Sequence, residues 1–121
     1  MSCLGNVIWF LLGGIWMGLS WWLVGVLCFL SIVGIPWGRA CFVMGQFSFF
    51  PFGKMPVSRE TLTGQPDVGT GPFGTLGNII WLLLAGIWIA LAHLGWALVC
   101  AVTIIGIPFA WQHVKLAGLA L

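Results

Sequence analysis

The sequence has very few charged residues. Only 5% of its 121 residues are Asp, Glu, Lys or Arg, and 61% are hydrophobic, whereas charged residues make up about a quarter of an ordinary soluble domain. The mean hydropathy is +1.15. This composition argues against a soluble domain and predicts a protein that lives in a lipid bilayer. The net charge of +2 is also too small and too scattered for the clustered basic face of a nucleic-acid-binding protein.

Acidic residues and catalytic groupings are missing from the apolar segments. No charge occurs over Leu4–Pro36 or Gly69–Gln112. Both acids, Glu60 and Asp67, lie in the segment between these two stretches. Proton- and sodium-coupled carriers usually hold an acid inside the membrane, so a coupled carrier is disfavoured. The sequence has no glycine-rich phosphate loop and no Ser/His/Asp set, and its four cysteines show no metal-ligand spacing with His93 or His113. We therefore expect no enzyme activity, no cofactor and no metal site, with the cysteines serving as packing residues.

What the sequence does contain is an internal repeat. Residues 4–38 align without a gap to residues 76–110, and nearly half of the aligned positions are identical. The shared positions include Gly-Asn-x-x-Trp near the start and Ile-x-Gly-Ile-Pro near the end. An apolar repeat with Gly and Pro at matching places is typical of a small membrane protein with internal pseudosymmetry. We divide the chain into a first membrane repeat at 1–50, a polar cytoplasmic linker at 51–72 and a second membrane repeat at 73–121.

The length of each uncharged stretch predicts two crossings per repeat. One straight helix of thirty-three residues would be about 50 Å long, which exceeds the roughly 30 Å hydrocarbon core. We therefore predict an all-α integral membrane protein with about four spans, in which each repeat is a transmembrane helical hairpin. The predicted turns lie near residues 20–22 and 92–95. The second helix of each hairpin is predicted to kink at Gly-Ile-Pro, and residues 37–50 are predicted to form an interfacial segment.

The few basic residues predict how the hairpins are oriented. Arg39, Lys54 and Arg59 follow the first apolar stretch and Lys115 follows the second. Two crossings per repeat put all four on one side, which the positive-inside rule makes cytoplasmic. Both termini are then cytoplasmic, and the two hairpins lie the same way up as parallel repeats. The alternative is a pair of re-entrant hairpins that dip into the bilayer and return without exposing a loop on the far side.

Matched helix interruptions predict the place of a solute or ion site. A proline leaves a carbonyl without its usual donor, and such interruptions in both halves of a membrane protein point to a binding site. The hydroxyls of Ser31 and Thr103 precede the two interruptions and can reach the freed carbonyls. The alternative is that the prolines only bend helices for packing. The candidate pore- or solute-lining residues are Asn6, Asn78, Ser31, Thr103, Gly34, Pro36, Gly106 and Pro108.

Other polar residues allow two interpretations each. Asn6 and Asn78 begin equivalent helices, where they can cap or join helices or line a pore mouth. His93 replaces Trp21 of the first repeat at the predicted far-side turn, where it is either a pH-sensitive gate or a solvated turn residue. His113 is predicted at the membrane interface. The small residues around Gly14 and Gly18 form a face for packing within the chain or between copies.

The doubled pattern resembles a known family. Gly-Asn-x-x-Trp, a later Trp and Ile-x-Gly-Ile-Pro, followed in the first repeat by an aromatic run that ends at Phe50–Lys54, resemble the YccF-like inner membrane proteins of bacteria. The resemblance covers nearly the whole chain and implies a location in the bacterial inner membrane. It implies no catalytic residue. The second repeat stops at Leu121, before a counterpart of Pro51–Lys54, which leaves open whether the natural chain extends further.

Two functions are compatible with these features. A four-helix protomer encloses too little volume for a pathway of its own, so the first hypothesis is a homo-oligomeric passive channel or pore for ions or small solutes. The alternative is a non-catalytic structural or regulatory membrane subunit that docks a larger membrane protein partner. Both place the chain in the lipid bilayer.

Overall fold

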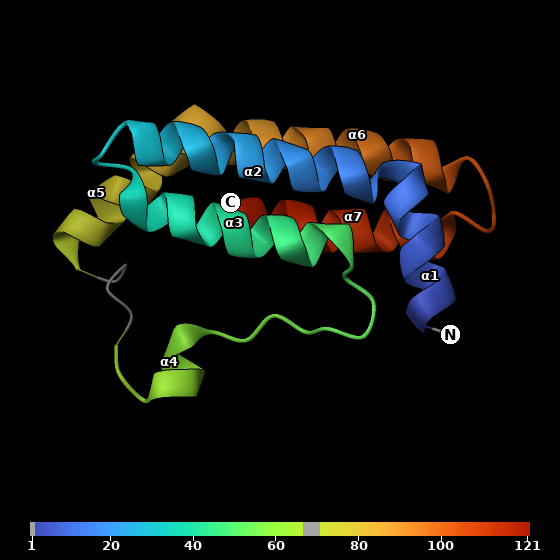
Figure 1. The fold of residues 1–121 in the computed structure, drawn as a ribbon, viewed down its shortest axis with the longest axis horizontal. Coiled ribbons are helices and arrows are strands. Elements are labelled where there is room, and N and C mark those ends of the chain that lie inside the picture. The colour runs from blue at the N-terminus through green and yellow to red at the C-terminus, as the bar shows by residue number, and fades with distance from the viewer. Residues whose placement is uncertain (1, 67–70) are drawn as a thin grey trace.

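The computed structural model describes residues 2–66 and 71–121, and their regular structure is helical throughout. The elements are α1 (Ser2–Trp9), the π-helix η1 (Phe10–Gly14), α2 (Ile15–Leu30), α3 (Ile35–Phe49), α4 (Arg59–Thr63), α5 (Pro72–Trp81), the π-helix η3 (Leu82–Gly86), α6 (Ile87–Ala101) and α7 (Ile107–Ala120) (Figure 1). The two halves therefore show the same succession of elements. The all-α prediction is confirmed.

Each half contains a helical hairpin, but its turn is not where the sequence analysis placed it. The pairs α2–α3 and α6–α7 pack along their lengths and turn at residues 31–34 and 102–106. The predicted turns near 20–22 and 92–95 are wrong, because α2 and α6 run unbroken through these positions. No proline lies at either place to break the backbone hydrogen bonds of the helix.

The predicted kink at Gly-Ile-Pro is also wrong. Pro36 and Pro108 lie in the first turn of α3 and α7, where a missing backbone N–H leaves no hydrogen bond unmade. The motif thus begins the second helix. Gly106 is required at its turn because a Cβ there would collide with the Cys100 carbonyl oxygen.

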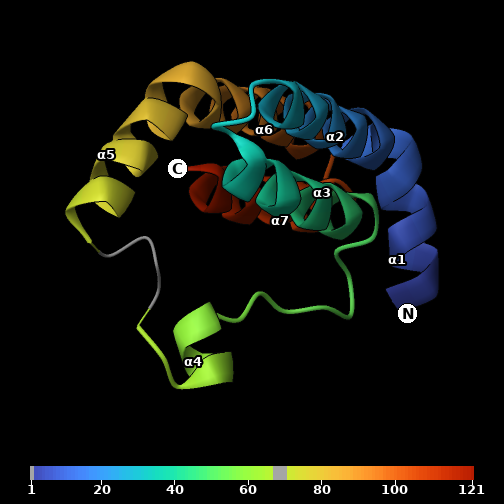
Figure 2. The same cartoon turned by 60° about the vertical axis from the view of Figure 1, so that its left-hand side comes forward.

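Within residues 2–66 and 71–121, two helices are long and apolar enough to cross a membrane, and both are bent. They are Ser2–Leu30 and Pro72–Ala101, and each changes direction at its π-helix, where Gly13 leaves the helical conformation in the first (Figure 2). Their straight parts, α2 with 16 residues and α6 with 15, are only about 24 and 22 Å long. About four full spans are therefore not confirmed.

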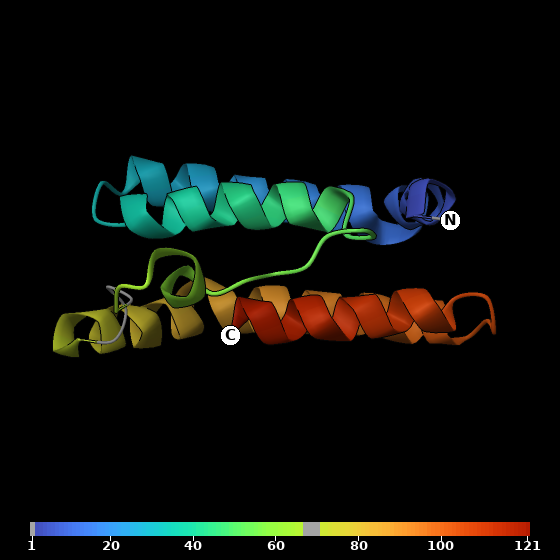
Figure 3. The same cartoon turned by 90° about the horizontal axis from the view of Figure 1, so that it is seen from below.

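The hairpins lie side by side and point in opposite directions. Helices α2 and α6 form one layer and α3 and α7 a second layer (Figure 2), while the linker and α4 lie beneath α3 and α7. The two hairpin turns are at opposite ends of the bundle (Figure 3). The prediction that both hairpins point the same way is wrong: the halves meet through equivalent positions of α2 and α6, and the two-fold relation between them reverses the chain direction.

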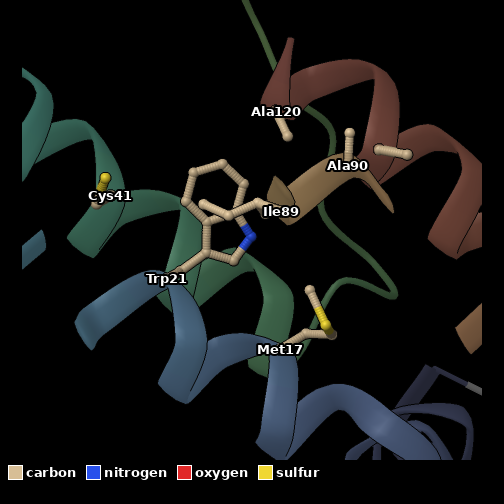
Figure 4. Close-up of a cluster of buried hydrophobic side chains, with 7 residues drawn as sticks. Met17, Trp21, Cys41, Ile89, Ala90 and Ala120 are labelled. Atoms are coloured by element: carbon tan, nitrogen blue, oxygen red, sulfur yellow. The ribbon is translucent and has the colours of Figure 1, made fainter. Parts of the chain in front are cut away.

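The core is shared by both hairpins. Figure 4 shows the Trp21 ring reaching from α2 toward Ile89 of α6 and Ala120 of α7. The small-residue face predicted from the sequence is used within the chain, because a Cβ on Gly18 would overlap the ring of Phe49. The two buried clusters are Met17, Trp21, Cys41, Ile89, Ala90, Ala117 and Ala120, and Trp9, Ala97, Cys100, Phe109, Ala110 and Leu116.

Candidate functional site

Buried polar side chains are rare in the described residues, and two of the three are histidines. His93 of α6 and His113 of α7 are both fully buried, as is Ser48. The sequence analysis placed His93 at a far-side turn and His113 at the membrane interface. The prediction for His93 is wrong, because α6 continues through the expected turn and the hairpin closes ten residues later. His113 is buried inside the bundle, and its depth in the membrane stays a prediction.

The two histidines belong to a chain of hydrogen bonds. Trp21 Nε1 donates to His93 Nε2 at 3.2 Å, and His93 Nδ1 lies 3.0 Å from His113 Nδ1. An indole N–H can only donate, so His93 Nε2 carries no proton and a neutral His93 has its proton on Nδ1. His93 then donates to His113 Nδ1, which places the His113 proton on Nε2. The hydrogen-bond partners thus assign one direction to the whole chain.

The chain ends on an atom without a partner. His113 Nε2 is buried and has no hydrogen bond among the described residues. It lies beside Gly13 of η1, where an added Cβ would be 3.2 Å from Nε2 and 3.1 Å from the Trp96 ring. The Trp9 ring covers the imidazole with its centroid 4.2 Å away. A buried unpaired donor costs about 1–3 kcal/mol, so this site has been kept at an energetic cost.

The site joins the two halves of the molecule. In residues 2–66 and 71–121, the Trp21–His93 bond is the side-chain hydrogen bond that connects the first hairpin to the second. A proton added to His93 Nε2 or to His113 Nδ1 would set two N–H groups against each other and break the chain. The arrangement can therefore respond to protonation.

Asn6, a predicted pore-lining residue, holds the linker instead. Its Nδ2 donates to the Phe52 carbonyl oxygen at 3.0 Å, and its Oδ1 accepts from the Phe52 N–H at 2.9 Å. This contact joins α1 to the linker, which differs from the helix cap or helix–helix bond considered in the sequence analysis, and whether Asn6 lines a pore stays a prediction. Asn78 is exposed on α5, and α5 and α1 lie at opposite ends of the bundle (Figure 1). The structure therefore does not bring the two asparagines together.

The remaining candidates form the two hairpin turns. Ser31 Oγ donates to the Cys28 carbonyl and accepts from Gly34 N–H at 3.0 Å, and Thr103 Oγ1 accepts from Gly106 N–H at 3.1 Å. Each set stays local, and the two turns lie at opposite ends of the bundle (Figure 3). Whether they line a pathway between copies of the chain stays a prediction.

The histidine pair is the feature that sequence reasoning missed. A signal was present: placing the turn at the Gly-Ile-Pro step puts both histidines about two to three helical turns from the same tip. They then fall at similar depth on adjacent helices.

The comparisons identify the family. The model of the YccF inner membrane component domain matches residues 4–54 and 76–121. The inner membrane protein YccF of Escherichia coli (strain K12) is 31% identical over 117 residues, which cover 96% of this chain and 79% of the relative. The protein of the same name from Shigella flexneri is equally similar. No solved structure matches. The chain therefore belongs to the YccF family of inner membrane components.

Proposed function

We propose that this chain is a non-catalytic structural membrane subunit that docks an apolar helix of a larger membrane protein. The observation that carries the proposal is an open cavity of about 510 Å³ between α6 and α7. Its lining is apolar: Leu94, Ala97, Leu98, Ala101, Ile107, Ala110, Trp111 and Val114.

The first repeat indicates which kind of side chain would fill the α6–α7 cavity. The positions that correspond to Leu94, Ala101 and Val114 are Trp22, Phe29 and Phe42. These three rings pack together, with the Phe42 centroid 5.8 Å from Trp22 and 5.7 Å from Phe29. The first repeat thus fills its own groove with aromatic side chains, whereas the second presents the same groove to apolar side chains from outside. A helix carrying one or two large apolar residues suits this space.

Crosslinking tests the proposal. A photo-activated residue at Leu98, a groove residue that is 74% exposed, is expected to give a discrete protein adduct in cells. Filling the groove with Ala101→Phe and Val114→Phe should abolish that adduct, and the matched control Val99→Phe, outside the groove on the same helix, should keep it. An adduct at twice the mass of the chain would identify a second copy instead. Absence of any protein adduct would contradict docking.

A homo-oligomeric passive channel for ions or small solutes is the second candidate. The observation that favours it is the polar chain Trp21–His93–His113 inside an otherwise apolar bundle, since ionisable residues in membrane segments usually mark ion or proton pathways. Purified protein in liposomes is expected to pass protons or small ions, and His113→Phe should reduce the flux with oligomer mass unchanged. A silent bilayer under pH, voltage and tension sweeps would argue against a channel.

A further inference from the structure

The two helix layers differ sharply in charge. Helices α2 and α6 contain no charged residue, and their exposed side chains are apolar, such as Leu23, Leu30 and Leu98. Arg39 lies on α3 and Lys115 on α7, and the remaining basic residues, Lys54 and Arg59, belong to the linker beneath these helices (Figure 1). All four basic residues thus lie on α3, α7 and the linker, together with the acid Glu60, whereas the α2/α6 face is apolar.

The basic residues meet in cavities between the linker and the bundle. Arg39 and Arg59 line one cavity of about 640 Å³ whose other lining includes Val43 and Val57. Lys54 and Lys115 line a second cavity of about 230 Å³ together with Gln112. Each cavity therefore combines two cations with apolar side chains, which is the chemistry that recognises an anionic phospholipid headgroup and the start of its acyl chains.

The hairpin turns expose apolar side chains. Val33 at one tip is 80% exposed, and Ile105 at the other is 78% exposed. A tip that emerged into water would leave these residues solvated, and nothing in the described residues covers them. Because the tips lie at opposite ends of the bundle (Figure 3), hydrocarbon must be present at both ends.

The linker excludes the upright orientation. It runs lengthwise along α3 and α7 (Figures 1 and 3), and residues 54–58 have no regular secondary structure. If the bundle axis followed the membrane normal, this backbone and the side chains of Lys54 and Arg59 would lie at hydrocarbon depth. Irregular backbone exposed to lipid does not occur there, because its polar groups find no partner.

We propose that the bundle lies parallel to the membrane surface in the cytoplasmic leaflet, with α2 and α6 among the acyl chains and the linker-facing basic cavities on anionic phospholipid headgroups. Helices α1 and α5 descend from the ends of the α2/α6 layer toward the linker side (Figure 2). They therefore connect the depth of the acyl chains with that of the headgroups. The positive-inside rule makes that side cytoplasmic. This orientation is independent of the partner proposed above.

Cysteine accessibility tests the orientation. In a variant whose four native cysteines are alanine, single cysteines replace Val33, Ile105 and, in the linker, Met55, which is 81% exposed. A membrane-impermeant maleimide is expected to label position 55 in inside-out vesicles but not in spheroplasts. Positions 33 and 105 should label from neither side and become reactive only in detergent. Labelling of a tip from either side, labelling of position 55 from outside, or its protection on both sides would overturn the proposal.

A second measurement keeps the native cysteines and tests the headgroup. In nanodiscs, phosphatidylglycerol is expected to be retained in preference to phosphatidylcholine. Arg39→Gln and Arg59→Gln should each weaken that preference about fivefold, whereas Ser20→Ala, on α2 and outside these cavities, should leave it unchanged. Adding inorganic phosphate to phosphatidylcholine discs should not raise the melting temperature as phosphatidylglycerol does. Equal retention of the two lipids, or full replacement by free phosphate, would overturn the headgroup assignment.

Discussion

The two repeats share a backbone plan and differ in how they complete it. In both, a tryptophan in the first helix bonds to a carbonyl near the end of the hairpin: Trp9 to Ser48 at 2.7 Å and Trp81 to Ala120 at 2.9 Å. The first repeat then fills its groove with its own aromatic rings and anchors the linker on Asn6. The second repeat leaves the equivalent groove open and Asn78 exposed. In the first repeat the groove and the asparagine are thus occupied by other parts of the chain, whereas in the second repeat both are exposed.

The centre of the molecule shows the same asymmetry. Trp21 donates to His93, which occupies the equivalent position of the second repeat, and His113 stands where the first repeat has Cys41. A symmetric Trp–Trp contact would offer two donors and no acceptor. Replacing one of the two tryptophans with histidine converts a contact between equals into a directional hydrogen bond.

Among the substitutions considered, removal of the Trp21 side chain should lower the free energy of unfolding most. Trp21 is 2% exposed, so Trp21→Ala leaves a cavity between the hairpins and frees His93 Nε2. We expect a loss of about 3–5 kcal/mol in the free energy of unfolding, measured by reversible denaturant titration in detergent micelles. Trp16→Ala, on the same helix but 60% exposed, is the control and should cost far less. Equal losses for the two variants would contradict a central role for Trp21.

A double-mutant cycle measures the interaction between His93 and His113. His93→Leu removes the acceptor of Trp21 and the donor to His113, and should cost about 1–3 kcal/mol because it leaves the buried Trp21 Nε1 donor and the His113 Nδ1 acceptor unpaired. His113→Leu alone strands the Nδ1 proton of His93. The double variant His93→Leu/His113→Leu should cost less than the sum of the two single changes. Strict additivity would show that the imidazoles do not interact.

The two asparagines offer a matched pair of substitutions. Asn6→Leu removes both hydrogen bonds to Phe52 and should destabilise the fold by about 1–2 kcal/mol, with faster proteolysis of the linker. Asn78→Leu should change neither quantity appreciably, because Asn78 is exposed. Similar linker protection in the two variants would show that the Asn6–Phe52 contact does not hold the linker.

Exchange of the groove residues should have the smallest effect on stability. Ala101→Phe gives the second repeat the residue of the first and should raise the free energy of unfolding by up to about 1 kcal/mol through added packing. The opposite exchange at another groove position, Phe42→Val, should lower it by about 1–2 kcal/mol because it opens the first groove. Thermal unfolding in a membrane mimetic measures both. A destabilised Ala101→Phe protein would mean that the open groove cannot accept an aromatic ring.

Several features were predictable because they depend on local chemistry. The all-helical fold follows from long apolar runs, whereas the bond of Asn6 to the linker was not among the roles that the sequence suggested for it. The hairpin turns were misplaced because a Gly-Ile-Pro step suits both a kink inside a helix and the start of a new one. The intrinsic helix propensities of residues 20–22 are too weak to decide by themselves whether the helix breaks there. Because the predicted turn was misplaced, His93 was predicted at that turn, and its proximity to His113 was missed.

The sequence by itself determined that the chain is helical, doubled and apolar, because composition and repeat length are properties of single residues and their order. Only the tertiary structure decided that the hairpins run in opposite directions and that Trp21, His93 and His113 meet. Those outcomes depend on which faces pack together, and a uniformly apolar helix carries no periodic signal to say which face that is. The contact of the two hairpins depends on such packing and on the Trp21–His93 hydrogen bond, which requires α2 and α6 to meet at equivalent positions.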